Sequence, residues 1–119
     1  MRKLEIMLPK QWRNILEQES KKVFLKYELQ IIDILLFGTV ERAKAQPKDI
    51  DVLIIFKKKK DLMIAQELRK RFIAKISLPI QITTKTYEEL FQSSFVVRES
   101  ILSEGYSLIY QHRTYFKRS

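Results

Sequence analysis

The chain contains no cysteine, which excludes disulfide bonds and zinc sites with thiolate ligands. Its single histidine, His112, stands near the end of the sequence, where we expect a surface side chain rather than a ligand. No apolar run approaches the roughly 18–20 residues that cross a membrane, and the opening MRKLEIMLPKQW lacks the apolar region of a signal peptide. We therefore expect a soluble, cytoplasmic protein in a reducing compartment, with no membrane partner.

Acidic residues are scarce relative to basic ones: 14 Asp and Glu stand against 23 Lys and Arg, which gives a net charge of +9. Such an excess favours polyanionic partners, such as nucleotides, nucleic acid or an acidic protein surface. It gathers in KKKK at 57–60, in RKRFIAK at 69–75 and in the C-terminal tail at 111–119. Solubility and lysine-rich loops explain the same charge equally well, so charge alone assigns no function.

Length and composition fit one small domain over residues 1–119, ending in the short basic tail. With 45% hydrophobic residues, the chain can build a small core. The hydrophobic pattern predicts helices at 9–29, 61–76 and 86–103 and strands at 31–37, 50–56 and 79–83, with a short strand or turn at 106–110. This order predicts an α/β (α+β) fold, in which helices pack on a small mixed β-sheet.

Local signals mark the expected helix starts. Pro9 suits the first position of a helix, where its missing N–H costs nothing. Asp61 suits an N-cap, and Thr86 with Glu89 has the spacing of a capping box. These signals place the starts of all three predicted helices.

Apolar spacing predicts which side chains are buried. We expect Trp12 to anchor the first helix on the sheet, and Asp33 to lie at the solvent edge of the first strand. Glu67 and Arg71 have the spacing of a favourable ion pair on the second helix. The buried stripes expected on the second and third helices are Leu62, Ala65, Leu68, Phe72, Ile73 and Ile76, and Phe91, Phe95, Val96 and Leu102.

Residues suited to phosphate and metal chemistry lie between the first two predicted strands. Gly38-Thr39 ends the first strand, and Asp49-Ile50-Asp51 opens the second. Residues two apart in a strand share a face, about 6.6 Å apart along the chain. Two such carboxylates suit the metal pair, roughly 3.5–4 Å apart, of phosphoryl transfer, and oxygen ligands favour Mg²⁺ or Mn²⁺. Glycine lets the backbone approach a phosphate, to which a threonine hydroxyl can donate.

Each half of this pattern alone is ordinary turn chemistry or a solvated strand start. The ordered combination, LFGTVERAKAQPKDIDVLI, resembles the signature of the minimal nucleotidyltransferases (MNT) of the DNA polymerase β superfamily. In that family a strand ends in Gly-Ser, and acid–apolar–acid opens the next strand. The ending ESILSEGYSLIY is similar to the family's last helix, Glu-Gly pair and apolar-Tyr finish. The resemblance runs from about residue 10 to residue 110 and implies the polymerase β-like nucleotidyltransferase fold.

The resemblance also implies roles for individual residues. Asp49 and Asp51 match the catalytic carboxylates that bind Mg²⁺ or Mn²⁺, and Gly38 and Thr39 match the pair that binds the nucleotide phosphates. Arg42 falls where the family often has a basic residue that steers the triphosphate, although a solvated loop arginine is the alternative. Thr39 replaces the usual serine and keeps its hydroxyl.

The activity implied by the resemblance is the transfer of a nucleoside monophosphate, AMP from ATP, to an acceptor. Small single-domain members pair with helical HEPN proteins as toxin–antitoxin systems, and some of these antitoxins attach AMP to the partner. A HEPN-type protein is therefore an expected partner, next to the nucleoside triphosphate, and a homo-oligomer remains open.

One departure from the family supports a different reading. Active members usually carry a third carboxylate on a later strand, and the matching position holds Gln81, whose amide cannot accept the nucleophile's proton. The alternative is a catalytically degenerate member that binds nucleotide or partner without chemistry. A second alternative, a basic nucleic-acid-binding module, lacks the expected aromatic strand or recognition helix. The sequence does not determine the acceptor, the base preference, the oligomeric state or whether a partner completes the site.

Overall fold

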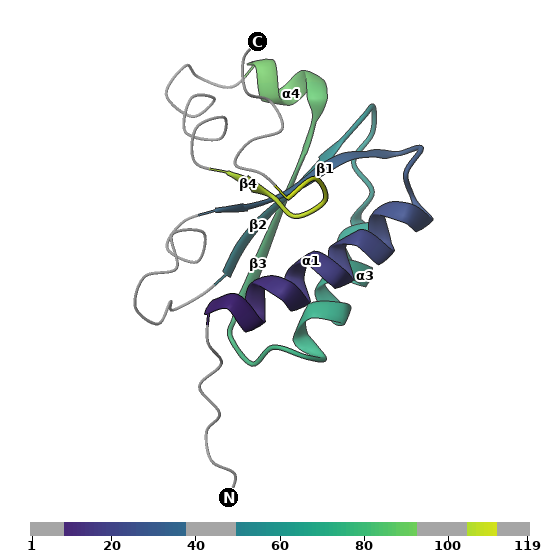
Figure 1. Ribbon diagram of the computed structural model, residues 1–119. Helices are drawn as coiled ribbons and strands as arrows, with labels where there is room; N and C mark the ends of the chain where they lie inside the picture. Colours follow the sequence, from purple (N-terminus) through teal and green to yellow (C-terminus); the bar gives the residue numbers. More distant parts are fainter. Residues whose placement is uncertain (1–8, 38–49, 93–104, 112–119) are drawn as a thin grey trace, which may run out of the picture.

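The computed structural model describes residues 9–37, 50–92 and 105–111 (Figure 1). Its elements follow one another as α1 (Pro9–Lys26), β1 (Ile31–Phe37), β2 (Ile50–Phe56), α3 (Leu62–Ile73), β3 (Ile80–Thr86), α4 (Tyr87–Gln92) and β4 (Tyr106–Ser107). The strands form one mixed sheet with helices packed on it, which confirms the predicted fold class. None of the helices in the described ranges combines the length and apolar character required to span a membrane.

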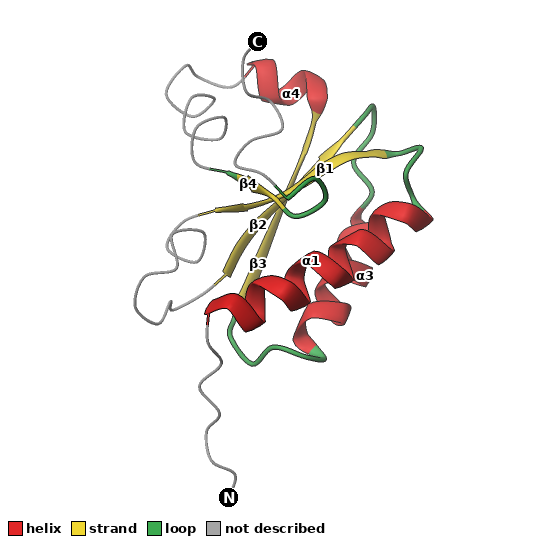
Figure 2. Ribbon diagram, in the orientation of Figure 1, coloured by secondary structure: helices red, strands yellow, loops and turns green. Residues whose placement is uncertain are grey.

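The sheet has the strand order β3-β2-β1-β4. β1 pairs antiparallel with β2 and with β4, whereas β2 and β3 pair parallel and are joined through α3. A parallel pair requires such a crossover, and a helix is its usual form. Figure 2 shows α1 and α3 together on one face of the sheet, apart from α4.

The main core lies between this sheet face and the two helices. Trp12, Leu16 and Val23 of α1 are buried, so Trp12 anchors the helix as predicted. From β1 and β2, alternate residues enter the same cluster, among them Ile34, Leu36, Val52 and Ile54. On the opposite face, a smaller cluster contains Leu35, Leu53, Ile55 and Leu90.

The helix starts confirm the local signals in the sequence. Asp61 is the N-cap of α3, and its carboxylate accepts a hydrogen bond from the Met63 N–H at 3.0 Å. At the start of α4, the Glu89 N–H donates to Thr86 Oγ1 and the Thr86 N–H donates to Glu89 Oε1, both at 3.0 Å. This reciprocal pair is a capping box, which satisfies two backbone donors that the helix leaves open.

The helix ends differ from the prediction because turns begin earlier than the apolar pattern suggested. α1 ends at Lys26, and a turn at 27–30 redirects the chain into β1. α3 ends at Ile73, where the N–H of the C-cap residue Ala74 bonds back to Lys70. Helix α4 is described only to Gln92, so the rest of the helix predicted at 86–103, with Phe95, Val96 and Leu102, lies outside the described residues.

Three residues that we expected to be buried are exposed. Leu62 is 67% exposed, Ile73 51% and Phe91 48%. The packed arc of α3 consists of Ile64, Ala65, Leu68 and Phe72. With about 100° between successive residues, positions 62 and 73 both lie beyond the same edge of that arc, by roughly 60° and 80°. The prediction was right for Ala65, Leu68 and Phe72, but it missed Ile64 because its stripe was centred too far round the helix, toward Leu62 and Ile73.

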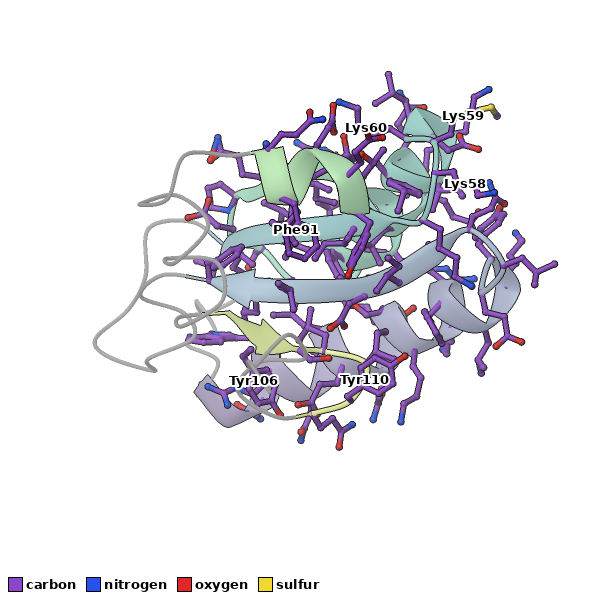
Figure 3. All side chains as sticks on the ribbon, turned by 90° about the horizontal axis from the view of Figure 1, so that it is seen from above. Lys58, Lys59, Lys60, Phe91, Tyr106 and Tyr110 are labelled. Atoms are coloured by element: carbon purple, nitrogen blue, oxygen red, sulfur yellow. The ribbon has the colours of Figure 1, made fainter. Side chains whose placement is uncertain are left out.

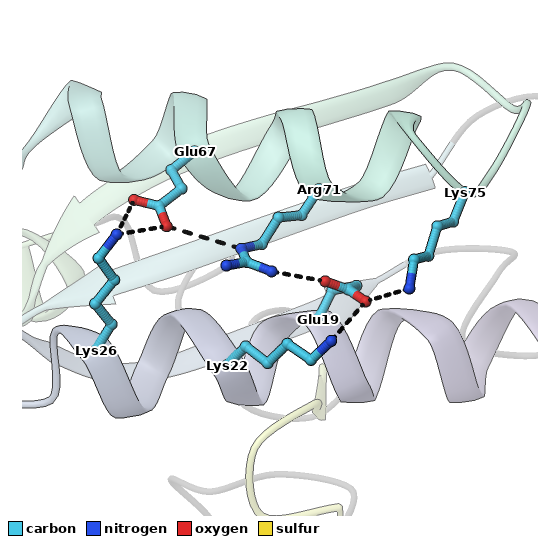
Figure 4. A network of polar contacts seen from close by, with 6 residues as sticks. All are labelled: Glu19, Lys22, Lys26, Glu67, Arg71 and Lys75. Atoms are coloured by element: carbon cyan, nitrogen blue, oxygen red, sulfur yellow. Dashed lines mark hydrogen bonds and ion pairs between the residues drawn. The ribbon is translucent and has the colours of Figure 1, made fainter.

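A network of charged side chains joins α1 to α3 on the outside of the helical layer (Figure 4). Glu19 is at its centre, with a side chain only 3% exposed, and it pairs with Arg71 at 3.1 Å and with Lys75 at 2.9 Å. The predicted pair between Glu67 and Arg71 is present at 3.7 Å. The whole network consists of Glu19, Lys22, Lys26, Glu67, Arg71 and Lys75.

Candidate active site

The candidate site begins where three neighbouring strand ends meet. Phe37, the last residue of β1, is the register partner of Asp51 near the start of β2. Asp51 is in turn the partner of Gln81 near the start of β3. The first two strands are therefore neighbours, and Gln81 lies about one strand spacing, or about 4.8 Å of backbone, from Asp51.

The side chain of Asp51 belongs to the face of the sheet that α1 and α3 do not cover. Its neighbours Ile50 and Val52 are buried in the main core beneath those helices. Because side chains alternate along a strand, Asp51 shares the other face with Leu53. Asp51 is half-buried and Gln81 is exposed, so a ligand can reach both residues at this edge of the sheet.

The backbone beneath these two residues is firmly held. The Ile50 N–H donates to the Pro79 carbonyl at 2.8 Å, which fixes the start of β2 against the start of β3. Arg69 of α3 donates from Nη1 to the Ile80 carbonyl at 2.6 Å. Both contacts flank the Asp51–Gln81 pair, so the pair is carried by sheet backbone rather than by a loop, which favours precise positioning.

The other predicted site residues, Gly38, Thr39, Arg42 and Asp49, lie outside the described residues. In the sequence, Gly38 follows Phe37 directly and Asp49 precedes Ile50 directly. Their predicted roles in binding phosphate and metal remain predictions. Within the described ranges, no group of three or more Asp, Glu, His or Cys side chains is arranged to hold a metal ion.

The donors that the structure places at the strand ends are compatible with a hard cation. The Asp51 carboxylate and the Gln81 amide oxygen are both oxygen donors, and they project from neighbouring positions on one face. Mg²⁺ is commonly held by one or two carboxylates while water and substrate phosphates complete its shell. The chemistry of this donor set therefore fits Mg²⁺ or Mn²⁺, with Gln81 as a weak neutral ligand.

Asp33 corrects one sequence prediction. We expected it at the solvent edge, but it is completely buried in β1. Its Oδ1 accepts hydrogen bonds from the Ser107 hydroxyl and the Ile34 N–H, both at 2.8 Å, whereas Oδ2 has no partner among the described residues. Burial raises the pKa of Asp33 to about 7, against the opposing effect of these two hydrogen bonds. The sequence concealed this because Ser107 lies far along the chain, on β4.

A polar cluster between α1 and β4 was also not predicted. The Tyr106 hydroxyl donates to Glu17 at 2.7 Å, and the Arg13 guanidinium lies 4.6 Å from the centre of the Tyr106 ring. Burial raises the pKa of Tyr106, and its bond to Glu17 acts in the same direction. Because Tyr106 is the register partner of Leu36, this cluster lies near the end of β1, on the helix side of the sheet. The i,i+4 spacing of Arg13 and Glu17 was the only signal available in the sequence.

No protein-family model and no curated protein sequence matches the chain. Solved structures do match it. A protein described as a minimal nucleotidyltransferase gives a TM-score of 0.61 at 19% identity, over 86% of this chain and 97% of that chain. A chain from a toxin–antitoxin crystal structure with AMP-PNP gives 0.55 at 18% identity, over 77% of this chain and 71% of the other.

A third match comes from the complex of a tri-AMPylated HEPN toxin with its MNT antitoxin from Shewanella oneidensis. Its TM-score is 0.52 at 18% identity, over 81% of this chain and 71% of the matched chain. The fold implied by the resemblance is thus confirmed. The chain has the nucleotidyltransferase-like fold and is structurally similar to the MNT antitoxins and minimal nucleotidyltransferases.

Proposed function

We propose that the chain is a metal-dependent nucleotidyltransferase that moves AMP from ATP to an acceptor on a helical partner protein, as an antitoxin-like component. The proposal rests on one observation above all. Asp51 stands at the edge where β1 ends, on the face of the sheet opposite α1 and α3, in a fold similar to that of MNT antitoxins. One matched structure was crystallised with AMP-PNP, and another contains an AMPylated HEPN toxin, which supports ATP and a HEPN-type protein as partners.

The chemistry of the proposed reaction is an in-line displacement. An acceptor hydroxyl attacks the α-phosphorus of ATP, the bond from that phosphorus to the bridging oxygen breaks, and pyrophosphate leaves with the bond electrons. Asp49 and Asp51 would hold Mg²⁺, which neutralises triphosphate charge, and Gly38, Thr39 and Arg42 would bind the phosphates. Positioning and charge stabilisation then account for most of the rate enhancement.

The proton of the attacking hydroxyl needs a separate acceptor. Gln81 is the register partner of Asp51, and its neutral amide cannot take that proton. Solvent or a base on the acceptor protein would receive it in the proposed reaction. General-base catalysis usually contributes about 10²–10⁴-fold, so this chain should work slowly without it.

Calorimetric titration with ATP tests the nucleotide site. We expect binding that requires Mg²⁺ and that weakens at least about tenfold in Asp51→Asn and in Asp49→Asn, because each change removes one negative ligand charge. Asp61→Asn makes the same chemical change at the cap of α3 and should bind ATP normally. Absence of ATP binding by the wild type with Mg²⁺ would overturn the proposal for the isolated chain.

A second candidate function, binding without chemistry, is favoured by Gln81 itself, and a substitution separates the two. With [α-³²P]ATP and a co-expressed HEPN-type protein, the wild type should transfer label slowly, and Gln81→Asp should accelerate transfer roughly 10²-fold by restoring a base. Thr83→Asp, two residues along the same face of β3, is the matched control and should give no gain. If ATP binds but neither the wild type nor Gln81→Asp transfers label, the protein binds nucleotide or partner without catalysing transfer.

A further inference from the structure

A groove of about 810 Å³ lies at the opposite end of the sheet from the candidate active site. Its lining consists of Phe24, Glu28, Leu29, Ile31, Ile32, Lys57, Tyr87 and Tyr110. Ile31 is the register partner of Phe56, five residues along β2 from Asp51, so the two sites are roughly 17 Å apart along the strand. The groove is therefore separate from the residues assigned to nucleotide transfer.

Well-anchored turns build this groove. The Lys57 N–H donates to the Gln30 carbonyl at 2.9 Å, which ties the turn after β2 to the turn before β1. The Tyr110 N–H donates to Ser107 Oγ at 2.8 Å, and Ser107 in turn donates to the buried Asp33. Hydrogen bonds among three separate parts of the chain thus fix the turns that carry the groove.

The walls of the groove expose apolar surface. Leu29 is 85% exposed, Tyr87 43% and Tyr110 42%. The aromatic rings meet edge to face, with 6.3 Å between the centres of Phe24 and Tyr110. Large exposed apolar side chains gathered in one concavity mark interaction surfaces more often than isolated ones do.

The groove has one lysine and one glutamate in its lining, and the lysine begins a run of four. Lys57 lines it, and Lys58 and Lys59 follow in the same exposed turn. Figure 3 shows Lys58 and Lys59 projecting from the end of the molecule where β1 begins, with Tyr110 on the side of β4. The fourth lysine of the run, Lys60, pairs with Glu89 at 3.2 Å and is partly neutralised. Of the other three, Lys57 lines the groove and Lys58 and Lys59 extend the exposed positive charge along the same turn.

We propose that this groove binds an acidic amphipathic helix of a protein partner. Apolar side chains at positions i, i+3 and i+4 of such a helix would fill the groove beside Leu29, Tyr87 and Tyr110, and its acidic residues would face the lysines. Charge complementarity of this kind selects the partner and speeds association. This surface is additional to the proposed transfer site and does not depend on it.

Two other occupants fit the same observations less well. A single-stranded nucleic acid needs open ring faces on which bases stack, but Phe24 and Tyr110 contact each other edge to face. A second copy of this chain, related by two-fold symmetry, would bring two sets of Lys57–Lys59 together and carries the same net charge of +9. An acidic protein segment avoids both conflicts.

Selection from a displayed library of random 16-residue peptides tests the proposal on the intact chain. We expect the enriched peptides to be net acidic, with apolar residues at helical spacing. Their affinity should fall at least tenfold in Leu29→Ser and in Tyr110→Ala, and severalfold in the double variant Lys58→Glu/Lys59→Glu. Leu62→Ser is the matched control, because Leu62 is 67% exposed on α3 outside the groove, and it should bind normally. An unchanged melting temperature verifies the fold of each variant.

Three results would overturn the proposal. Peptides that are neutral or basic, or that bind Leu29→Ser as well as the wild type, would show that the groove does not recognise an acidic helix. Binding of a dT₁₆ oligonucleotide that is lost in the Leu29→Ser and Tyr110→Ala variants would assign the groove to nucleic acid. A wild-type dimer in sedimentation that dissociates in Leu29→Ser would assign it to self-association. None of these measurements uses ATP, so they are independent of the transfer reaction.

Discussion

The two faces of the sheet are made by the same strands but carry different kinds of residues. Toward α1 and α3, β1 and β2 present apolar side chains, including Leu36, Val52 and Ile54. Toward the other face, the same strands present two carboxylates, Asp33 and Asp51, next to a small apolar cluster. We infer that the apolar face beneath α1 and α3 provides most of the stability of the fold. That stability lets the opposite face carry Asp33 and Asp51.

Buried carboxylates make the comparison sharper. Glu19, between the helices, is surrounded by Arg71, Lys75 and Lys22, whereas the donors to Asp33 among the described residues are two neutral groups. The pKa of Glu19 is lowered and the pKa of Asp33 is raised. Burial opposes the charged form in both cases, and the presence or absence of cations decides the direction.

The largest expected effect compares the two apolar layers directly. Ile54 and Ile55 are adjacent in β2, both are fully buried, and they point to opposite faces. We expect Ile54→Ala to lower the free energy of unfolding by about 4 kcal/mol and Ile55→Ala by about 2 kcal/mol, because the cavity on the helix side has more packed neighbours to lose. Urea denaturation at neutral pH measures both values.

The pair serves as its own control, since the residue type, the strand and the exposure are matched. Equal losses would mean that the small cluster is packed as completely as the main core. A larger loss for Ile55→Ala would reverse the assignment of the stabilising face.

The second expected effect concerns pH and isolates Asp33. Because the pKa of Asp33 is raised to about 7 in the folded state, against 3.8 as its ordinary value, the folded state holds a proton that the unfolded state releases. Its contribution to stability is therefore fully present below pH 3.8 and is lost as pH rises through about 7. Asp33→Asn, which mimics the protonated form, should be more stable than the wild type at pH 8.

Urea denaturation from pH 4 to pH 8 measures this dependence. As pH rises, the free energy of unfolding of the wild type should fall relative to that of Asp33→Asn. In the middle of the range the slope should reach up to about 1.4 kcal/mol per pH unit. Asp61→Asn makes the same change at a half-exposed helix cap. In this variant the free energy of unfolding should depend on pH as it does in the wild type. Parallel profiles for wild type and Asp33→Asn would show that Asp33 does not titrate in this range.

Much of this fold could be predicted from local pattern. The strands of β1 and β2 are continuous apolar runs, and the caps at Asp61 and Thr86 depend only on residues within one helical turn. Burial on the helices was harder to predict, because Leu62 and Ile73 have the right residue type but lie outside the packed arc. Which arc of a helix is buried is decided by the sheet beneath it, and the sequence of the helix alone does not contain that information.

In the candidate site, too, the features set by local sequence could be predicted and those set by long-range contacts could not. The Gly-Thr and Asp-Ile-Asp segments were singled out from their order in the sequence, and the pairing of Phe37 with Asp51 shows that the strands that carry them are neighbours. The burial of Asp33 was missed because its partner Ser107 stands 74 residues away. Long-range partners of this kind are set by topology and leave no trace in local spacing.

The smallest expected effect returns to the other buried carboxylate. Burial opposes the charged form of Glu19, but Lys75 and Arg71 outweigh it and lower the pKa below 4.5. Glu19 therefore stabilises the fold above pH 4.5, and this stabilisation is lost as pH falls through its lowered pKa. Since its partners are substantially exposed, we expect Glu19→Gln to cost only about 1–2 kcal/mol at neutral pH and almost nothing at pH 3.

Glu67→Gln is the matched change in the same network, at a side chain that is 24% exposed rather than 3%. It should cost less than Glu19→Gln at neutral pH, because solvent screens the more exposed pair. Denaturation of both variants at pH 7 and pH 3 measures the difference. If Glu19→Gln still lowers the free energy of unfolding at pH 3, Glu19 stabilises the fold through packing rather than through its charge. The cations around Glu19 would then not explain how it differs from Asp33.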